Sequence, residues 1–531
     1  MNRHTTIILG NGFILVTPDF PVELEEDLRY WHRTLGMNPH TMRRESSGQY
    51  RDLYTVQTTV DPATDVRTRT LTTMAGFTHR IKQVLGRCGW TFDIVDKRLP
   101  MPKPNVDAAM VGLRPYQYNP AYKMIMSRGG IAACPTGWGK TRLLTAIMRA
   151  FPHEALKLRG TPLTVVATPD KDITEKDYRD IVELLPDREV GLVMSGRSKF
   201  SDDIQVATLD SLHRIQAEDV GIVIVDEVHS AASDTRAEAL MAFNKASMWG
   251  VSATPDGRFD GRDKVTEGMF GPPVVRVSYQ DGVKCGALVP ITVYWVMCPE
   301  PSIGIDRYLR YSSRNGKYRH GVWANENRNE LIGRLLKEIP DGLQTLCILQ
   351  YIEHMNNIAK ASDGVATLVH GETDPKKLMC YSNVHSISTK ERRELYNKVA
   401  SAEIRKVIST HVYKQGVNFP ELSVVINAGG GGSDIVAKQI PGRESRKTAT
   451  KDSSILIDFW HPWDVCTTTK VTDVDGKKVP KTRTGPGPIH SDDKAREKAY
   501  RNLGFKSVWI DDISQLPFLQ EKSKAEAGLE Q

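Results

Sequence analysis

Short apolar runs alternate with helical stretches between about residues 110 and 280. The runs are rich in Val, Ile, Leu and Ala, and they cover residues 130–133, 163–167, 204–207, 220–225 and 248–252. Continuous apolar strands separated by helices are typical of a parallel sheet that is covered on both faces. We therefore predict a parallel-sheet core in this segment.

The same pattern returns between about residues 325 and 460. The candidate strands there are residues 345–349, 367–369, 406–409, 424–426 and 454–457. A second core of similar size is predicted, so that the chain forms a two-lobed molecule.

The first 105 residues have a smaller α/β pattern. Leu24, Leu28, Trp31 and Leu35 recur at helical spacing, which predicts a helix over residues 21–35. A second helix is expected at residues 77–88, and a proline-rich linker at residues 99–104. The strands predicted in this part are residues 7–9, 13–16, 53–56 and 92–95.

The composition shifts again after the second core. Residues 467–490 are rich in Thr, Lys, Gly and Pro and contain the turn dipeptide Asp475-Gly476, so they predict a loop or hairpin. A helix at residues 491–504 and a strand at residues 507–513 follow.

These elements predict an α/β fold with two tandem parallel-sheet cores after a small α/β N-terminal domain. The predicted domains are an accessory domain at residues 1–105, a first core at 106–285, a connection at 286–324, and a second core with a C-terminal extension at 325–531.

Composition excludes several classes of protein. The 531 residues are 40% hydrophobic and 25% charged, which is unlike a collagen-like, mostly disordered or disulfide-scaffold chain. No apolar run reaches the length of a membrane span, and the seven cysteines include no CxxC pair, so a reducing, cytoplasmic compartment and no membrane partner are expected. The net charge of +7 is a weak indication of a polyanionic partner.

The strongest chemical motif is the sequence CPTGWGKT at residues 134–141. It follows an apolar strand and precedes a helical run, which is the context that a phosphate-binding loop requires. Its glycines allow close approach to phosphates, Lys140 is placed to reach the β- and γ-phosphates, and Thr141 is placed to ligate Mg²⁺. ATP and Mg²⁺ are therefore the predicted cofactors.

Two acids end the strand at residues 222–225. A carboxylate at the carboxyl end of a central strand can hold Mg²⁺, and the next one can polarise an attacking water. We assign Asp226 to the metal and Glu227 to the general base.

From about residue 112 onward, these motifs and their order resemble the superfamily-2 helicases and translocases, which have two RecA-like cores. The sequence LRPYQ at residues 113–117 resembles their adenine-reading segment, DEVH at 226–229 a DExH motif, and SAT at 252–254 the motif that couples the nucleotide site to strand movement. The resemblance implies that the hydroxyls of Ser252 and Thr254 bond His229. The residues that it assigns to nucleotide binding are Arg114, Gln117, Pro135, Thr136, Gly137, Trp138, Gly139, Lys140, Thr141 and Gly416.

Further motifs imply contacts with nucleic acid and a second set of catalytic groups. The residues that resemble backbone-contacting motifs are Thr168, Pro169, Thr208, His370, Gly371 and Thr410. Residues 439–446, QIPGRESR, resemble the motif that supplies an arginine finger, which implies catalytic roles for Gln439, Arg443 and Arg446. The Gln-Ile start of this motif and the four glycines at 429–432 depart from the family pattern.

Within the superfamily, the match is most similar to the DExH branch that contains bacteriophage UvsW and its XPB and RecG relatives. This implies an ATP-dependent DNA helicase or translocase that remodels branched DNA in recombination, repair or replication, located in the host cytoplasm if the chain is phage-encoded. The expected partner is duplex or branched DNA with low sequence specificity, with RNA and single-strand-binding or recombination proteins as further candidates. An RNA helicase and the motor subunit of a restriction-type nuclease remain as alternatives.

The N-terminal domain is expected to recognise duplex or branched DNA, or else to dock a partner protein. Its candidate DNA contacts are Arg43, Arg44, Arg80, Lys82 and Arg87. Four basic residues of the predicted loop or hairpin are further candidates: Lys477, Lys478, Lys481 and Arg483.

Overall fold

The computed structural model describes residues 3–37, 44–255, 258, 260–372, 374–410, 419–431, 447–448, 451–474 and 477–526. The chain divides into two compact units. The first comprises Met1–Pro135 and Gly139–Val277, and the second comprises Ser278–Gln531 with Thr136–Trp138. No helix among the described residues is both long and apolar enough to cross a membrane.

The N-terminal part of the first unit is built on a five-stranded sheet of order β5-β6-β2-β1-β7. All neighbouring strands are antiparallel except β1 and β7. One helix, α2 (Thr78–Arg87), buries Ile81, Val84 and Leu85 in the core of this sheet. The strands are β1 (His4–Leu9), β2 (Phe13–Thr17), β5 (Tyr54–Val60), β6 (Arg67–Met74) and β7 (Thr91–Asp96).

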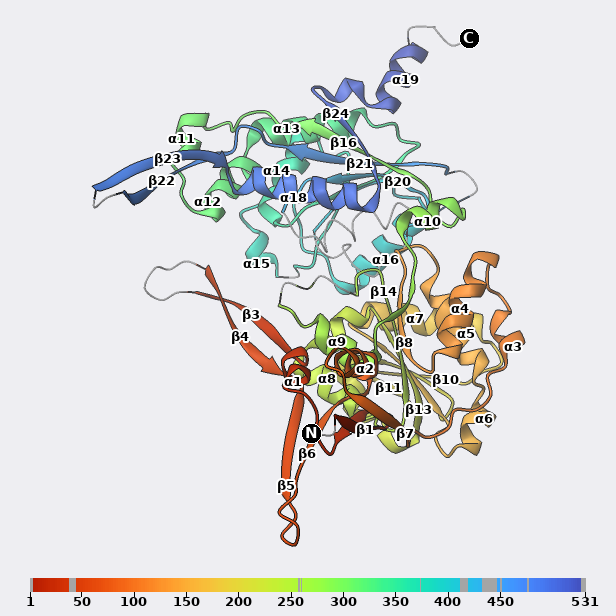
Figure 1. Cartoon of the computed structure of the whole chain (residues 1–531). Helices are drawn as coiled ribbons and strands as arrows, with labels where there is room; N and C mark the ends of the chain where they lie inside the picture. Colours follow the sequence, from red (N-terminus) through yellow and green to blue (C-terminus); the bar gives the residue numbers. More distant parts are fainter. Residues whose placement is uncertain are drawn as a thin grey trace. The chain divides into compact units, whose positions relative to one another are not determined.

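The helix predicted over residues 21–35 is wrong. The helix α1 covers only Val22–Asp27, and the chain continues as β3 (Arg29–Met37), which pairs with β4 (Arg44–Asp52) in a two-stranded ribbon (Figure 1). Tyr30 and His32 are buried whereas Trp31 is exposed, so burial follows the alternation of a strand. The spacing of leucines suggested a helix, but the packing of Tyr30 against the neighbouring core favours a strand.

The first core is the parallel sheet that the sequence predicts. Its strand order is β11-β10-β12-β9-β13-β14-β8-β15, and only β11 is antiparallel to its neighbour. The strands are β8 (Gly130–Ala133), β9 (Leu163–Thr168), β10 (Val190–Met194), β11 (Arg197–Lys199), β12 (Ile204–Thr208), β13 (Val220–Asp226), β14 (Ser247–Ser252) and β15 (Pro273–Arg276). The helices are α3 (Val106–Met110), α4 (Tyr118–Met126), α5 (Lys140–Ala150), α6 (His153–Leu158), α7 (Lys171–Leu184), α8 (Asp234–Met241) and α9 (Asp263–Phe270). Because the central strands are parallel, their carboxyl ends meet at one edge of the sheet.

The N-terminal sheet is joined to the first core by specific contacts. Arg80 on α2 makes a bidentate pair with Glu267 on α9, at 2.6 and 2.9 Å, and also contacts Asp27. Gly76 packs so closely that an added Cβ would lie 2.2 Å from the Glu267 carbonyl oxygen. Arg80, a candidate DNA contact from the sequence, therefore has its guanidinium in an internal ion pair.

The second unit contains a seven-stranded sheet of order β18-β19-β17-β20-β21-β16-β24, in which every pair is parallel. The strands are β16 (Ile291–Met297), β17 (Gln344–Ile348), β18 (Thr367–Val369), β19 (Lys406–Ser409), β20 (Leu422–Asn427), β21 (Ser454–Trp460) and β24 (Lys506–Ile510). Its helices include α10 (Tyr279–Lys284), α11 (Ile305–Leu309), α12 (Arg314–Tyr318), α13 (Glu326–Glu338), α14 (Ile352–Ala361), α15 (Pro375–Leu378), α16 (Thr389–Ala400), α18 (Pro488–Leu503) and α19 (Pro517–Glu526).

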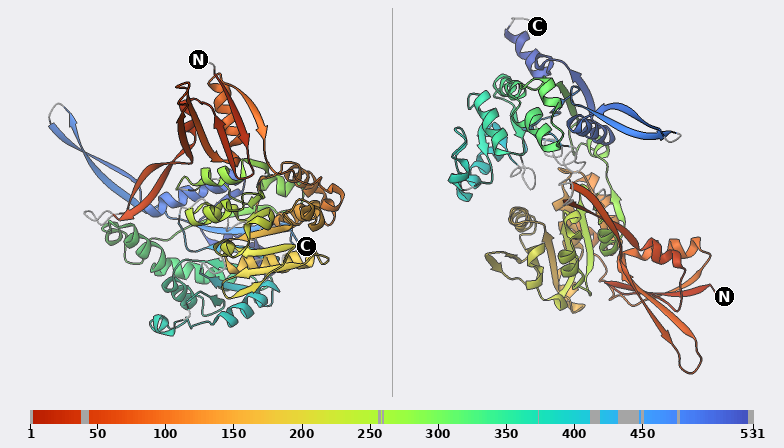
Figure 2. Two further views of the ribbon diagram at one scale, coloured as in Figure 1. Left: turned by 90° about the horizontal axis from the view of Figure 1, so that it is seen from below. Right: turned by 90° about the vertical axis from the view of Figure 1, so that its left-hand side faces the viewer.

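Two segments of this unit form strands outside the predicted core pattern. Residues 286–324, expected as a connection, contain β16, which lies inside the second sheet between β21 and β24. The segment predicted as a loop or hairpin, residues 467–490, lies in a hairpin formed by β22 (Val465–Val474) and β23 (Lys477–Pro486). This hairpin and the β3–β4 and β5–β6 pairs each extend as a two-stranded ribbon (Figure 2). The side chains of Lys477, Lys478, Lys481 and Arg483 lie outside the described part of the structure.

Candidate active site

The predicted phosphate-binding loop lies between a buried strand and a helix. β8 ends at Ala133 and α5 begins at Lys140, and in the loop Gly137 and Gly139 have φ values of 85° and 98°. A Cβ on Gly139 would lie 2.6 Å from the Gln117 Nε2 atom, so both space and conformation favour glycine. The first amides of α5 have no partner within the helix, and this N-terminus therefore offers N–H donors to an anion.

The two predicted acids lie at the end of a fully buried central strand. β13 is flanked by β9 and β14 and ends at Asp226, and Glu227 follows it with a φ of 50°. Glu227 Oε1 lies 2.6 Å from Lys140 Nζ. The loop lysine and the proposed base therefore meet at the same edge of the sheet.

Ser252, at the end of β14, joins this pair to His229. Its hydroxyl donates to Glu227 Oε2 at 3.2 Å, accepts from the Thr254 amide at 3.1 Å, and lies 2.9 Å from His229 Nδ1. The hydrogen bond that the resemblance implied between Ser252 and His229 is therefore present. The Thr254 hydroxyl, in contrast, is buried and has no hydrogen-bond partner among the described residues.

Burial and neighbouring charges shift the pKa values of this cluster in different directions. Burial and the nearby Asp177 raise the pKa of Asp226 to about 8. Burial opposes the charge on Glu227, but Lys140 and His229 outweigh it and lower the pKa of that carboxyl. Burial likewise opposes the charge on Lys140, yet Glu227 and Asp226 give a net upward shift of its pKa. Burial lowers the pKa of His229 against the opposing effect of Glu227.

The donors at this edge suit a hard cation bound together with phosphates. Asp226 offers carboxyl oxygens, and Thr141, the second residue of α5, offers a hydroxyl. Oxygen ligands of this kind are preferred by Mg²⁺, whose charge would favour the ionised form of Asp226. Asp226 Oδ1 accepts the Glu227 amide at 2.9 Å, which fixes the orientation of the carboxylate. Among the residues that the structure describes, no group of three or more His, Cys, Asp or Glu side chains could hold a metal ion.

The predicted adenine-reading residues lie next to the loop. Gln117 is fully buried, accepts the Arg114 amide at 3.0 Å and donates to the Gly139 carbonyl at 3.1 Å. Arg114 donates to the Tyr116 hydroxyl at 2.8 Å. Gln117 therefore links this segment directly to the phosphate-binding loop.

The predicted nucleic-acid residues of the first core lie at the carboxyl ends of adjacent strands. Thr168 of β9 and Thr208 of β12 are paired in register and are both buried. The Thr168 hydroxyl bonds the Thr174 hydroxyl, and the Thr208 hydroxyl donates to Ser211 at 2.8 Å. Pro169 follows Thr168, and its carbonyl accepts from Arg236 at 3.3 Å. Both threonine hydroxyls are therefore engaged inside the protein.

In the second core, the predicted residues are described only in part. His370 is fully buried, its Nε2 lies 2.9 Å from the His385 carbonyl oxygen, and Gly371 follows it. The Thr410 amide donates to the Val369 carbonyl oxygen at 3.1 Å. Four of the predicted residues lie outside the described part of the chain: Gly416, Gln439, Arg443 and Arg446.

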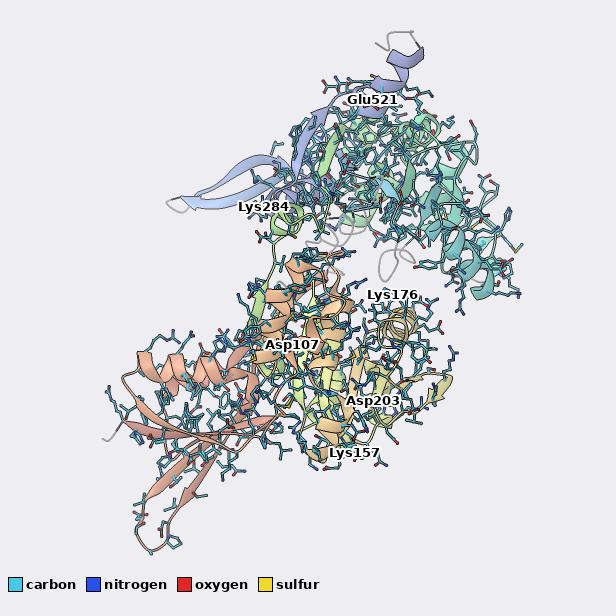
Figure 3. The ribbon with its side chains drawn as sticks, turned by 90° about the vertical axis from the view of Figure 1, so that its right-hand side faces the viewer. Asp107, Lys157, Lys176, Asp203, Lys284 and Glu521 are labelled. Atoms are coloured by element: carbon cyan, nitrogen blue, oxygen red, sulfur yellow. The ribbon has the colours of Figure 1, made fainter. Side chains whose placement is uncertain are left out.

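The structure adds residues that the motifs did not reveal. Arg258 donates to the His229 carbonyl at 2.7 Å and makes a bidentate pair with Asp260 at 2.9 and 2.7 Å. Lys176 on α7 (labelled in Figure 3) pairs with the fully buried Asp177 at 2.9 Å. Arg258 follows the SAT motif by only four positions, which is the one local sequence feature that could have pointed to it.

Two family matches cover the segments that carry these motifs. Residues 110–257 match the family described as "Type III restriction enzyme, res subunit", and residues 327–448 match the family described as "Helicase conserved C-terminal domain". The chain belongs to the superfamily-2 helicases. Its two parallel-sheet cores are the tandem RecA-like cores of that superfamily, and the helicase is an ATP-hydrolysing enzyme that acts on nucleic acid.

Several relatives of this helicase are known. It is 24% identical over 375 residues to "DNA 3'-5' translocase XPB2" of Sulfurisphaera tokodaii, and this match covers 65% of the chain and 81% of the relative. It is 29% identical over 159 residues to "Putative helicase 109L" of Invertebrate iridescent virus 3, which covers 28% of the chain but only 45% of that relative. The solved structure of T4 UvsW is 15% identical, with a TM-score of 0.40 over 96% of this chain and 99% of that one.

Proposed function

We propose that this helicase is an ATP-dependent DNA translocase that remodels branched DNA. The observation that carries the proposal is the cluster at the carboxyl edge of the first core, where Lys140, Asp226, Glu227, Ser252 and His229 come together. DNA is favoured as the track because the archaeal relative that matches over 81% of its length is named a DNA translocase.

In the proposed mechanism, Lys140 changes partner when nucleotide binds. Its ammonium pairs with Glu227 in the structure, and it would move to the β- and γ-phosphates that the α5 N-terminus receives. Glu227, released from this ion pair but still hydrogen-bonded to Ser252, would then orient and deprotonate the attacking water. Thr141 and Asp226 would hold Mg²⁺, which when bound neutralises charge on the phosphates.

The remaining nucleotide-binding and catalytic roles follow from the resemblance. Gln117 and Arg114 would read the adenine edge, with Pro135, Thr136, Gly137, Trp138 and Gly139 forming the loop around the phosphates. Arg443 and Arg446 would stabilise charge on the transferred phosphoryl group. Gln439 would act with them as a catalytic residue, and Gly416 would bind the nucleotide. A change in the hydrogen bonding of Glu227 would alter the bond between Ser252 and His229, so Ser252 would be the coupling residue of the first core.

Translocation would rest on contacts with the nucleic-acid backbone. The segments that contain Thr168, Pro169, Thr208, His370, Gly371 and Thr410 would contact phosphates through backbone groups and neighbouring side chains. Phosphate contacts carry little sequence information, so we expect low sequence preference and binding that weakens steeply with salt. The proposed setting is the cytoplasm, in cooperation with single-strand-binding or recombination proteins.

Strand displacement tests this proposal. A four-way DNA junction, a forked DNA and an RNA duplex of matched length are each incubated with the helicase, ATP and Mg²⁺. We expect ATP-dependent conversion of the branched DNA substrates and little conversion of the RNA duplex. Conversion of RNA alone would contradict the proposal and favour an RNA helicase.

A further inference from the structure

The β3–β4 ribbon of the N-terminal part has two chemically different faces. Along β3, Tyr30 and His32 are 6% exposed, whereas Trp31 between them is 44% exposed. On β4, Tyr50 lies directly opposite Trp31 in the antiparallel register and is 70% exposed. Because side chains alternate between faces, one face is buried and the other presents two aromatic rings to solvent.

The buried face fixes the base of the ribbon on the first core. Tyr30 belongs to the apolar cluster of that core, and Arg51, its partner in register, pairs with Asp234 at 3.1 Å. The Arg33 amide donates to the Asp260 carbonyl at 3.3 Å. A Cβ on Gly261 would lie 2.6 Å from the Trp31 carbonyl oxygen, so core and ribbon are in close contact. The ribbon is therefore held at its base by apolar, ionic and backbone contacts.

The solvent-facing rings of Trp31 and Tyr50, here called the platform, pack edge to face and leave ring surface open to solvent. The ring centroids of Trp31 and Tyr50 are 5.0 Å apart with an interplanar angle of 72°. A Cβ on Gly48 would lie 2.4 Å from the indole of Trp31, so glycine allows the indole to lie against β4. Two adjacent exposed aromatic rings cost solvation free energy, and their position on a strand pair held by the first core favours a ligand with flat apolar faces.

The charge of the two strands favours one class of ligand. β3 and β4 contain four arginines and two acids, a net charge of +2, although Arg29 and Arg51 are paired with Asp52 and Asp234. A partner that combines flat apolar groups with negative charge is a nucleic-acid strand with unpaired bases, since bases stack on aromatic side chains and phosphates attract arginine.

The ribbon is also connected to the hydrolysis site. Arg258 donates to the His229 carbonyl at 2.7 Å and pairs with Asp260, whose carbonyl accepts the Arg33 amide of β3. A continuous path of hydrogen bonds therefore runs from the DExH motif to the base of the ribbon. Such a path can transmit a change at the nucleotide to a ligand on the ribbon.

We propose that the Trp31–Tyr50 platform stacks an unpaired nucleobase of the DNA strand beside the branch point. This inference rests on the proposed function, because it assigns a contact to the branched DNA that the helicase remodels. The platform would hold a nucleobase out of the duplex. The end of the ribbon that contacts the first core would move together with that core.

Binding to two forked DNAs tests the platform. One fork carries normal bases in the unpaired positions next to the junction, and the other carries abasic sites there, so that only the bases differ. Affinity is measured by fluorescence anisotropy for the wild type and for Trp31→Ala, Tyr50→Ala and Phe13→Ala. Phe13 is the matched control because it is an aromatic residue of the same N-terminal part with 46% exposure.

We expect Trp31→Ala and Tyr50→Ala to weaken binding of the normal fork by about 5- to 150-fold, the range for loss of one stacked base. The wild type should bind the abasic fork more weakly than the normal fork by a similar factor. The two variants should bind both forks with nearly the same affinity. Phe13→Ala should match the wild type on both forks. Trp31→Phe, which keeps a ring, should restore much of the affinity.

Two results would overturn the inference. Equal losses on both forks would mean that the rings do not contact bases, and unchanged affinity on both would favour docking of a protein partner. ATP hydrolysis stimulated by a four-way DNA junction is measured in parallel, because its absence in the wild type would contradict the proposed function instead. If Trp31→Ala lowers the unfolding temperature, Tyr50→Ala decides the outcome, since the Tyr50 side chain is mostly in solvent.

Discussion

The sharpest prediction separates the two hydroxyls of the SAT motif. Ser252 and Thr254 are both buried, and the family resemblance assigns both to coupling. Only the Ser252 hydroxyl is fully hydrogen-bonded, with one bond donated to Glu227 and two accepted from Thr254 N and His229 Nδ1. We therefore predict that Ser252→Ala impairs the helicase and that the isosteric Thr254→Val does not.

The expected loss of stability depends on which hydrogen-bond donors each substitution leaves without an acceptor. Without the Ser252 hydroxyl, the Thr254 amide becomes a buried donor with no partner, at a cost of about 1–3 kcal/mol. His229 Nδ1 has an alternative, because Glu227 Oε2 lies 3.4 Å away, and a direct bond between them would offset its loss. That bond would occupy the carboxylate that is to act on water. In Thr254→Val no hydrogen bond among the described residues is lost, so the cost should stay below about 1 kcal/mol.

Two assays read this difference. Urea unfolding should show a loss of about 1–3 kcal/mol for Ser252→Ala, and steady-state ATP hydrolysis should show a smaller stimulation by DNA. Thr254→Val should resemble the wild type in both assays. Equal effects of the two variants, or wild-type behaviour of Ser252→Ala, would refute the assignment of coupling to the Ser252 hydroxyl.

Three further predictions test other parts of the structure. Gly139→Ala should raise the KM for ATP by about 5- to 150-fold, because the residue has a φ of 98° and its Cβ would lie 2.6 Å from Gln117 Nε2; nucleotide titration measures this. Arg80→Met should lower the free energy of unfolding by about 1–2 kcal/mol through loss of the bidentate Glu267 pair, whereas Lys82→Met on the same helix should not. Burial opposes the charge on His461, but Cys298 and Asp493 raise its pKa to about 9. The contribution of His461 to the free energy of unfolding should therefore be full below about pH 6.5 and fall by at most about 3 kcal/mol as the pH rises to 9. Urea unfolding at several pH values measures this dependence, and His461→Gln should flatten it.

The motifs of the first core were predictable because each is encoded locally. The phosphate-binding loop needs a strand, glycines and a helix N-terminus in sequence, and residues 130–150 supply all three. The acids at 226 and 227 follow a run of buried β-branched residues, which predicts both the strand and its carboxyl end. The bond between Ser252 and His229 depends on β13 and β14 being neighbours, so it was expected only because the family resemblance implied the bond itself.

Elements that depend on distant contacts were not predictable. Residues 29–35 form a strand because Tyr30 packs on the first core, yet the spacing of Leu28, Trp31 and Leu35 also fits a helix. β16 joins a sheet whose neighbouring strands begin at Ser454 and Lys506, far away in sequence. Arg80 has the pattern of a solvated basic helix, but its partner Glu267 lies 187 positions further along the chain.

The central claim is that Glu227 performs ATP hydrolysis that branched DNA stimulates. Steady-state hydrolysis is measured for the wild type and Glu227→Gln, without nucleic acid and with single-stranded DNA, duplex DNA, a four-way junction and RNA. We predict strong stimulation by branched DNA in the wild type and a loss of about 10²–10⁴-fold in kcat for the variant, with ATP binding retained. Hydrolysis by Glu227→Gln at the wild-type rate, or stimulation by RNA but not by DNA, would contradict the account.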